Sequence, residues 1–123
     1  AHTDLLLTTC FTVYDQLKGK HPNLHCIPCS LDVAHFSQGR QKLIEPDDQL
    51  NLTRPRVGFY GVIDRKFDFD LLMELADLRP KYQFIVAGPV VDLDTRSLPR
   101  RGNVHYLGKK DYHVLPLYLA GWD

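Results

Sequence analysis

Residues 56–88 read RVGFYGVIDRKFDFDLLMELADLRPKYQFIVAG, and the pattern of this stretch decides the fold class. It opens with a short apolar run, residues 56–60, that stops at a glycine. Asp68 then suits the N-cap of a helix whose leucines recur at helical spacing as far as Pro80. A second apolar run, residues 82–87, follows. This strand–helix–strand order predicts two parallel strands joined by a right-handed crossover.

The same pattern continues toward the C-terminus. Residues 103–107 (NVHYL) read as a third strand, and Pro116 suits the first turn of a last helix. We therefore expect an α/β fold with a Rossmann-like parallel sheet and flanking helices. Each of the three strands runs into a glycine, and the ligand crevice of such a sheet lies beyond the carboxyl ends of its strands. The glycines are Gly61, Gly88 and Gly108, which are either ordinary turn residues or places where a ligand approaches the backbone.

The N-terminal third predicts a smaller strand–helix–strand unit. Residues 4–9 and 24–27 read as strands, and Phe11, Tyr14 and Leu17 recur on one face of a helix. The polar stretch 37–54 has no clear period and reads as a linker. The chain is thus expected to divide into segments 1–36, 37–54 and 55–123.

The composition limits the functional classes. Fifteen Lys and Arg side chains balance fifteen Asp and Glu, so no overall field attracts nucleic acid. Three cysteines are too few for a secreted disulfide framework. No apolar run approaches the roughly 20 residues that cross a bilayer. A cytoplasmic location is the expectation.

The turn after the first strand of the 56–88 stretch is a candidate phosphate site. Residues 61–68 (GVIDRKFD) place a glycine, two adjacent cations and a helix start within one short segment. Helix N-termini and arginine both attract phosphate groups. The segment lacks the second glycine and the hydroxyl of a G-x-x-x-x-G-K-[ST] loop, so the alternative is a solvated Arg-Lys pair.

These residues carry a family resemblance. The segments RPRVGFYGVIDRKFDFDLL, YQFIVAGPV and RGNVHYLGKKDYHVLPLYLAGWD resemble the donor-binding half of group 1 glycosyltransferases of the retaining GT-B type. DLLLTTCFTVYDQL is similar to the last strand and helix of their N-terminal domain. IPCSLDVAHF resembles their interdomain segment I-P-N-G-V-D-x-x-x-F. The resemblance covers nearly the whole chain and implies part of a GT-B fold.

The resemblance implies a transferase that moves a sugar from a nucleotide-sugar to a glycan or lipid-linked acceptor, with no cofactor and no metal. Gly61, Arg65 and Lys66 match the family's diphosphate-facing G-x-x-x-[RK]-K-G, whereas Phe67 replaces its final glycine. Further residues implied to line the donor cleft are Val62, Gly88, Pro89 and Gly108.

The family's acidic E-x7-E segment and its acceptor-side residues find no counterpart in the chain. We therefore expect a fragment that lacks its catalytic residues, is inactive alone and self-associates. The parent enzyme is expected in the cytoplasm, with peripheral contact at the inner face of the membrane.

The stretch HCIPCSLDVAHF, residues 25–36, raises two other functional classes. Cys26 and Cys29 have C-x-x-C spacing, with His25 and His35 on either side. A structural zinc site needs four ligands, usually from two such pairs, and a redox dithiol needs its first cysteine at a helix N-terminus. We interpret the spacing as coincidence, since Cys29 stands where the family usually has Asn. A thiol-redox or zinc module, and a non-catalytic α/β binding or interaction module, remain the alternatives.

Overall fold

The computed structural model describes residues 3–41 and 44–123, and the chain separates into two compact units, Ala1–Asp32 and Val33–Asp123. The smaller unit confirms the predicted strand–helix–strand order. Its strands pair in parallel, with Leu6 opposite Leu24 and Thr8 opposite Cys26. Its elements are β1 (Leu6–Thr8), α1 (Phe11–Leu17) and β2 (Leu24–Cys26).

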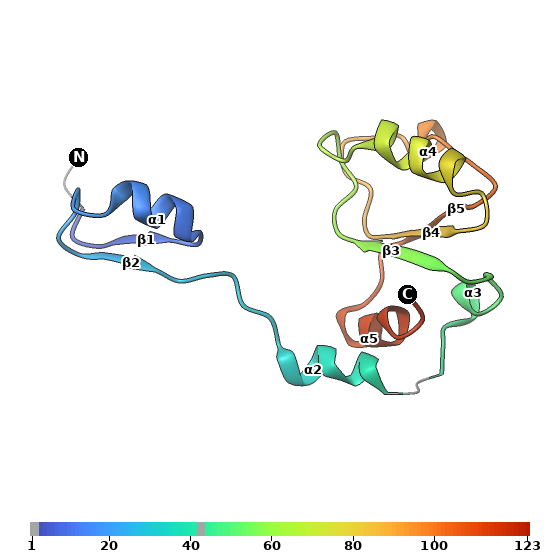
Figure 1. Ribbon diagram of the computed structural model, residues 1–123, viewed down its shortest axis with the longest axis horizontal. Helices are drawn as coiled ribbons and strands as arrows, with labels where there is room; N and C mark the ends of the chain where they lie inside the picture. Colours follow the sequence, from blue (N-terminus) through green and yellow to red (C-terminus); the bar gives the residue numbers. More distant parts are fainter. Residues whose placement is uncertain (1–2, 42–43) are drawn as a thin grey trace. The chain divides into compact units, whose positions relative to one another are not determined.

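The larger unit is built on a three-stranded parallel sheet in the order β3-β4-β5. The predicted strands and the helix between the first two are confirmed to within one residue at each end. Figure 1 shows α4 on one face of this sheet and α5 on the other. The elements are β3 (Arg56–Tyr60), α4 (Phe69–Leu78), β4 (Gln83–Ala87), η2 (Thr95–Ser97), β5 (Val104–Gly108), η3 (Tyr112–Val114) and α5 (Leu115–Leu119).

Helix α4 forms where its sequence predicts. The Asp68 carboxylate accepts a hydrogen bond from the Leu71 N–H at 2.9 Å, which satisfies a free donor of the first turn. Beyond this cap, the helix buries one apolar face against alternate residues of the sheet. The resulting core comprises Ile63, Leu72, Met73, Ala76, Phe84, Val86, Leu98 and Val104. On the opposite face α5 buries Leu115, Pro116 and Tyr118.

The stretch 37–54 differs from the expected linker. It contains the end of α2 (Val33–Ser37), then η1 (Gln38–Arg40) and α3 (Asp47–Leu50); residues 42–43 lie outside the described part. Gln49 is fully buried, its amide donating to the Tyr118 carbonyl and accepting from the Trp122 indole, both at 3.0 Å. This segment is held in place by hydrogen bonds of polar side chains. Such contacts need no periodic apolar pattern, so the sequence did not reveal them.

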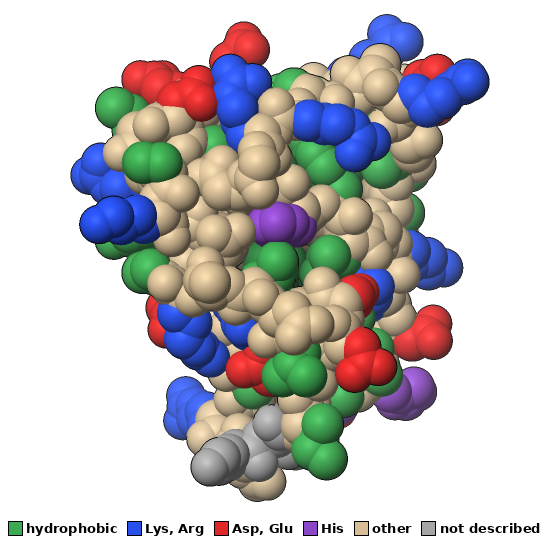
Figure 2. All heavy atoms as spheres, turned by 90° about the vertical axis from the view of Figure 1, so that its right-hand side faces the viewer, with side chains coloured by type: hydrophobic (Ala, Val, Ile, Leu, Met, Phe, Trp, Pro, Cys, Tyr) green, Lys and Arg blue, Asp and Glu red, His purple; other side chains and the backbone are tan. Residues whose placement is uncertain are grey.

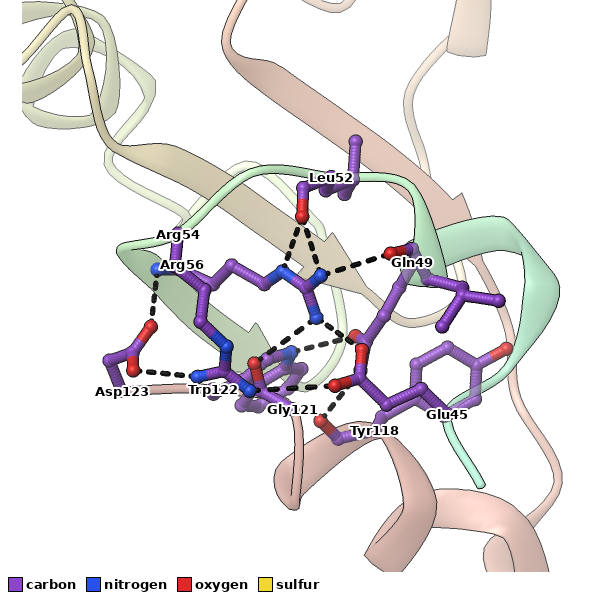
Figure 3. Close-up of polar contacts among 10 residues, drawn as sticks. Glu45, Gln49, Leu52, Arg54, Arg56, Tyr118, Gly121, Trp122 and Asp123 are labelled. Carbon is purple, nitrogen blue, oxygen red and sulfur yellow. Dashed lines mark hydrogen bonds and ion pairs between the residues drawn. The ribbon is translucent and has the colours of Figure 1, made fainter. Parts of the chain in front are cut away.

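Arg56 fastens the same segment to β3 (Figure 3). Arg56 is 4% exposed, and its guanidinium pairs with the Glu45 carboxylate and donates to the carbonyls of Leu50 and Leu52. Its main-chain N–H donates to the Asp123 carboxylate at 2.8 Å, while the Asp123 N–H donates to the Arg56 carbonyl at 2.9 Å. The first residue of β3 thus connects the α3 region with the end of the chain.

Both units are therefore α/β, with small parallel sheets and flanking helices. Within residues 3–41 and 44–123, no helix is long and apolar enough to cross a membrane.

Candidate functional site

The three predicted glycines lie next to one another at the carboxyl ends of the strands of the larger sheet. Gly61 follows β3, and its N–H donates to the Ala87 carbonyl at 3.1 Å. The Gly88 N–H donates to the carbonyl of Gly108 at 2.9 Å. The carboxyl ends of β3, β4 and β5 therefore meet side by side, which is the part of an open α/β sheet where ligands bind.

Gly88 is needed here for close backbone packing, and its own backbone is not exposed to a ligand. It is buried, it has a φ of +153°, and a β-carbon at this position would overlap the carbonyl group of Gly61. Gly108 is different, because it is exposed, has a φ of +68° and has open space around it. Of the two, only Gly108 leaves its backbone accessible to a ligand.

The remaining predicted lining residues take unequal positions. Val62 is 52% exposed. Pro89 is half-buried, and its carbonyl accepts the Ile63 N–H at 2.9 Å, so it joins the loops after β3 and β4. The loop after β3 is therefore attached to the sheet on one side and open on the other.

A tight turn presents the two cations. The Asp64 carboxylate accepts the Lys66 N–H at 2.8 Å, and its carbonyl accepts the Phe67 N–H at 3.1 Å. The side chains of Arg65 and Lys66 are exposed and form no hydrogen bond or ion pair with residues 3–41 or 44–123. Two adjacent positive charges thus face solvent beside the Gly61 turn.

Phe67 anchors this turn. Its ring lies between Phe59 (5.0 Å between centroids) and Phe69 (4.9 Å) and packs against the α4 core. These aromatic contacts fix the turn at the position where the resembling glycosyltransferase motif has glycine. The pattern of separated phenylalanines in FYGVIDRKFDF was the signal for this cluster, but sequence alone does not show which rings meet.

The start of α4 contributes less to anion binding than its position suggests. The Asp68 carboxylate already caps the Leu71 N–H and adds a negative charge at this end of the helix. The positive helix end is thus partly neutralised. The two exposed cations are the main groups here that attract an anion.

Helices α4 and α5 cover opposite faces of the sheet, and Asp123 returns to the outer edge of β3 through its N–H bond to Arg56 (Figure 1). Ligands of open α/β sheets bind beyond the carboxyl ends of the strands. The turn at Gly61 lies at this end of β3.

An apolar groove of about 430 Å³ lies beside this turn. Its lining includes Val57 and Phe59 from β3, Leu71 and Leu75 from α4, and Lys66 at one end. Sequence reasoning missed it, because the alternation of Val57 and Phe59 also fits a strand that α4 covers completely. α4 instead leaves both of these side chains more than one third exposed.

Other candidate groups have structural partners. His105 Nε2 lies 2.7 Å from Gln83 Oε1, and partial burial lowers the pKa of His105. Asp94 caps the Arg96 N–H and forms an ion pair with its guanidinium at 3.2 Å. Both side chains are thus held by neighbouring residues of the chain.

Asp48, Lys110 and Tyr118 form a polar cluster at α5. The Lys110 ammonium and the Tyr118 hydroxyl both donate to the Asp48 carboxylate, at 2.5 and 2.9 Å. Partial burial acts to raise the pKa of Asp48, but these two hydrogen bonds hold that pKa below its ordinary value. The cluster joins α3 to α5, and its charges are matched.

The C-x-x-C stretch provides no cluster of ligands. Cys26 is half-buried, Cys29 and Cys10 are exposed, and all three are free thiols. His25 bonds Asn23 at 2.8 Å. In the described part of the chain, no three His, Cys, Asp or Glu side chains are grouped so that they could hold a metal ion.

The face of the molecule shown in Figure 2 does not carry one dominant sign of charge. Figure 2 shows Lys and Arg interspersed with Asp and Glu over the face it presents. This distribution agrees with the zero net charge and offers no broad basic patch on that face.

Comparisons with protein-family models, with curated proteins and with solved structures gave no match.

Proposed function

We propose that the unit Val33–Asp123 belongs to the donor side of a retaining, GT-B type glycosyltransferase, which transfers a sugar from a nucleotide-sugar to a glycan or lipid-linked acceptor. The observation that carries this proposal is the place of the Gly61 turn. It lies at the carboxyl end of β3, and it presents Arg65 and Lys66, whose side chains form no hydrogen bond or ion pair within residues 3–41 and 44–123.

The chemistry of a donor diphosphate suits this turn. Its oxygens are strong acceptors, a guanidinium binds them with two parallel N–H groups, and an ammonium adds a compact charge. The exposed Gly108 backbone and the Val62 side chain complete a surface along the same edge. The groups that perform the transfer and hold the acceptor are proposed to lie outside these residues.

Nucleotide binding tests the proposal directly. UDP and GDP are titrated into the protein labelled with ¹⁵N, and amide shifts are followed. We expect shifts at Gly61, Lys66 and Gly108. Arg65→Ala or Lys66→Ala should weaken binding roughly ten-fold or more, because each removes a charge-assisted contact. Lys81→Ala is the matched control, since Lys81 is an exposed cation far from the Gly61 turn along the sheet.

Two outcomes contradict the proposal. The first is an absence of nucleotide-dependent shifts at millimolar concentration, which instead favours a non-catalytic interaction module. The second is binding that Arg65→Ala and Lys66→Ala weaken no more than Lys81→Ala does.

A further inference from the structure

The loop after β5 has few main-chain contacts of its own. It begins at Gly108, whose backbone is exposed and whose carbonyl accepts the Gly88 N–H at 2.9 Å. The main-chain groups of the next two residues, Lys109 and Lys110, form no hydrogen bond with residues 3–41 or 44–123. The course of this loop therefore depends on contacts of its side chains.

Two helices that precede β3 in the chain provide these contacts. The Lys110 ammonium donates to the Asp48 carboxylate of α3 at 2.5 Å, and it lies 5.2 Å from the centre of the Tyr118 ring. The Tyr118 hydroxyl donates to the same carboxylate at 2.9 Å. Further along the chain, the ring of Tyr112 stacks on that of His35 in α2, with 4.4 Å between centroids. The loop is thus attached in its middle to α3 and at its end to α2.

The contact with Asp48 is the one that pairs two charges. The Lys110 side chain is only 17% exposed, and that of Asp48 is 39% exposed. A partly buried ammonium is stable beside a carboxylate but costly to leave without one. No other carboxylate in the described part of the chain forms an ion pair with Lys110. If Asp48 is removed, the Lys110 side chain should therefore turn toward solvent, and the loop should lose its fixed position.

We propose that Asp48 is a positioning residue for the nucleotide site. Through Lys110 and Tyr118 it holds the loop after β5, and with it the exposed Gly108 backbone, beside the carboxyl end of β4. This inference rests on the proposed donor site, because it assigns a role within that site. Asp48 acts through Lys110 and is not proposed to touch the nucleotide. The stretch that the sequence predicts as a linker thus shapes the ligand-binding edge of the sheet.

Nucleotide binding and amide exchange test this role. Asp48→Ala should weaken the binding of UDP or GDP roughly five-fold or more, because Gly108 is no longer held in place. In the protein without nucleotide, it should also speed amide exchange and shift the amide signals of residues 108–110. Asp77→Ala is the matched control. Asp77 also pairs with one cation, Arg101, at 2.7 Å, but near the start of β5.

A double variant separates this role from a general loss of stability. Lys110→Met should weaken nucleotide binding by a factor similar to that of Asp48→Ala. Adding Asp48→Ala to Lys110→Met should weaken binding little further, because both substitutions remove one contact. All affinities are measured well below the melting temperatures of the variants, so that a lower stability alone does not change them.

The possible failures are distinguishable. A wild-type protein that binds neither nucleotide overturns the proposed donor site, and the role of Asp48 with it. Wild-type binding that Asp48→Ala weakens no more than Asp77→Ala does overturns the positioning role alone. Unchanged amide exchange of residues 108–110 in Asp48→Ala, or independent effects of Asp48→Ala and Lys110→Met in the double variant, also overturn that role.

Discussion

Gly88 packs directly beneath the carbonyl group of Gly61, so closely that a β-carbon on Gly88 would overlap it. This contact holds the carboxyl ends of β3 and β4 together at the point where both strands finish. It also gives a structural reason for a glycine that the sequence marks as either a turn residue or a place where a ligand approaches the backbone. The turn that presents Arg65 and Lys66 depends on this packing, although Gly88 itself is buried.

Substitution of Gly88 tests this role. Gly88→Ala should destabilise the protein by about 3 kcal/mol or more, because it adds a backbone clash to a φ of +153° that side chains disfavour. Gly102→Ala is the control, since open space surrounds Gly102, and it should change stability by less than about 0.5 kcal/mol. Urea unfolding measures both variants, and equal effects would remove the packing argument.

Arg56 provides a second test, of the segment that the sequence predicts as a linker. Arg56→Met leaves the Glu45 carboxylate, which is 20% exposed, without its buried partner, and should cost about 3 kcal/mol. Arg54→Met removes an exposed ion-pair partner of Asp123 and a longer contact with Glu45 at 3.4 Å, and should cost less than about 1 kcal/mol. If Arg56→Met proves as mild as Arg54→Met in urea unfolding, Arg56 does not hold the segment in place.

His105 predicts a pH dependence of stability. Partial burial lowers the pKa of His105 in the folded protein, so the unfolded chain binds a proton more readily. The contribution of neutral His105 to the free energy of unfolding should be present above the unfolded pKa, about 6.5. This contribution should be lost as pH falls below that value toward the folded pKa. Melting temperatures of the wild type and His105→Gln between pH 7.5 and 5 give the difference that isolates this residue. The difference between the two proteins should change in favour of His105→Gln at low pH; a constant difference would contradict the assignment.

The three thiols should bind no zinc. The described residues offer no group of three ligands, and a structural zinc site needs four. Elemental analysis of protein purified with zinc present should give far less than one zinc per chain, and chelator should leave the melting temperature unchanged. One bound zinc per chain, lost in Cys29→Ser, would show that the C-x-x-C spacing has a function.

Local sequence signals predicted much of the larger unit. Asp68 forms the helix cap that its position before an apolar periodic segment indicates, and the runs that end at Gly61, Gly88 and Gly108 are strands. Their glycine ends meet at one edge, because parallel strands bring their carboxyl ends together. Such features depend on residues a few positions apart, which a sequence shows directly.

Contacts between residues far apart in the chain could not be predicted from the sequence. Gln49 lies in a polar stretch, yet it is buried between the Tyr118 carbonyl and the Trp122 indole, more than 60 residues away. Phe67 stands next to two cations in a polar turn, and only its contacts with Phe59 and Phe69 show how the turn is held. Neither outcome can be read from periodicity, because the partners come from separate elements.

The sequence by itself determined the type and order of the elements of this protein, since strand period, helix spacing, caps and glycine ends are properties of neighbouring residues. Only the tertiary structure decided how these elements pack and which side chains they leave exposed. It placed α4 and α5 on opposite faces and buried Gly88 against Gly61. It left the side chains of Arg65 and Lys66 exposed, with no hydrogen bond or ion pair to the part of the chain that the structure describes. It also left Val57 and Phe59 of β3 more than one third exposed. These properties depend on which segments pack together and how much space remains between them, and packing is settled only when the whole chain has folded.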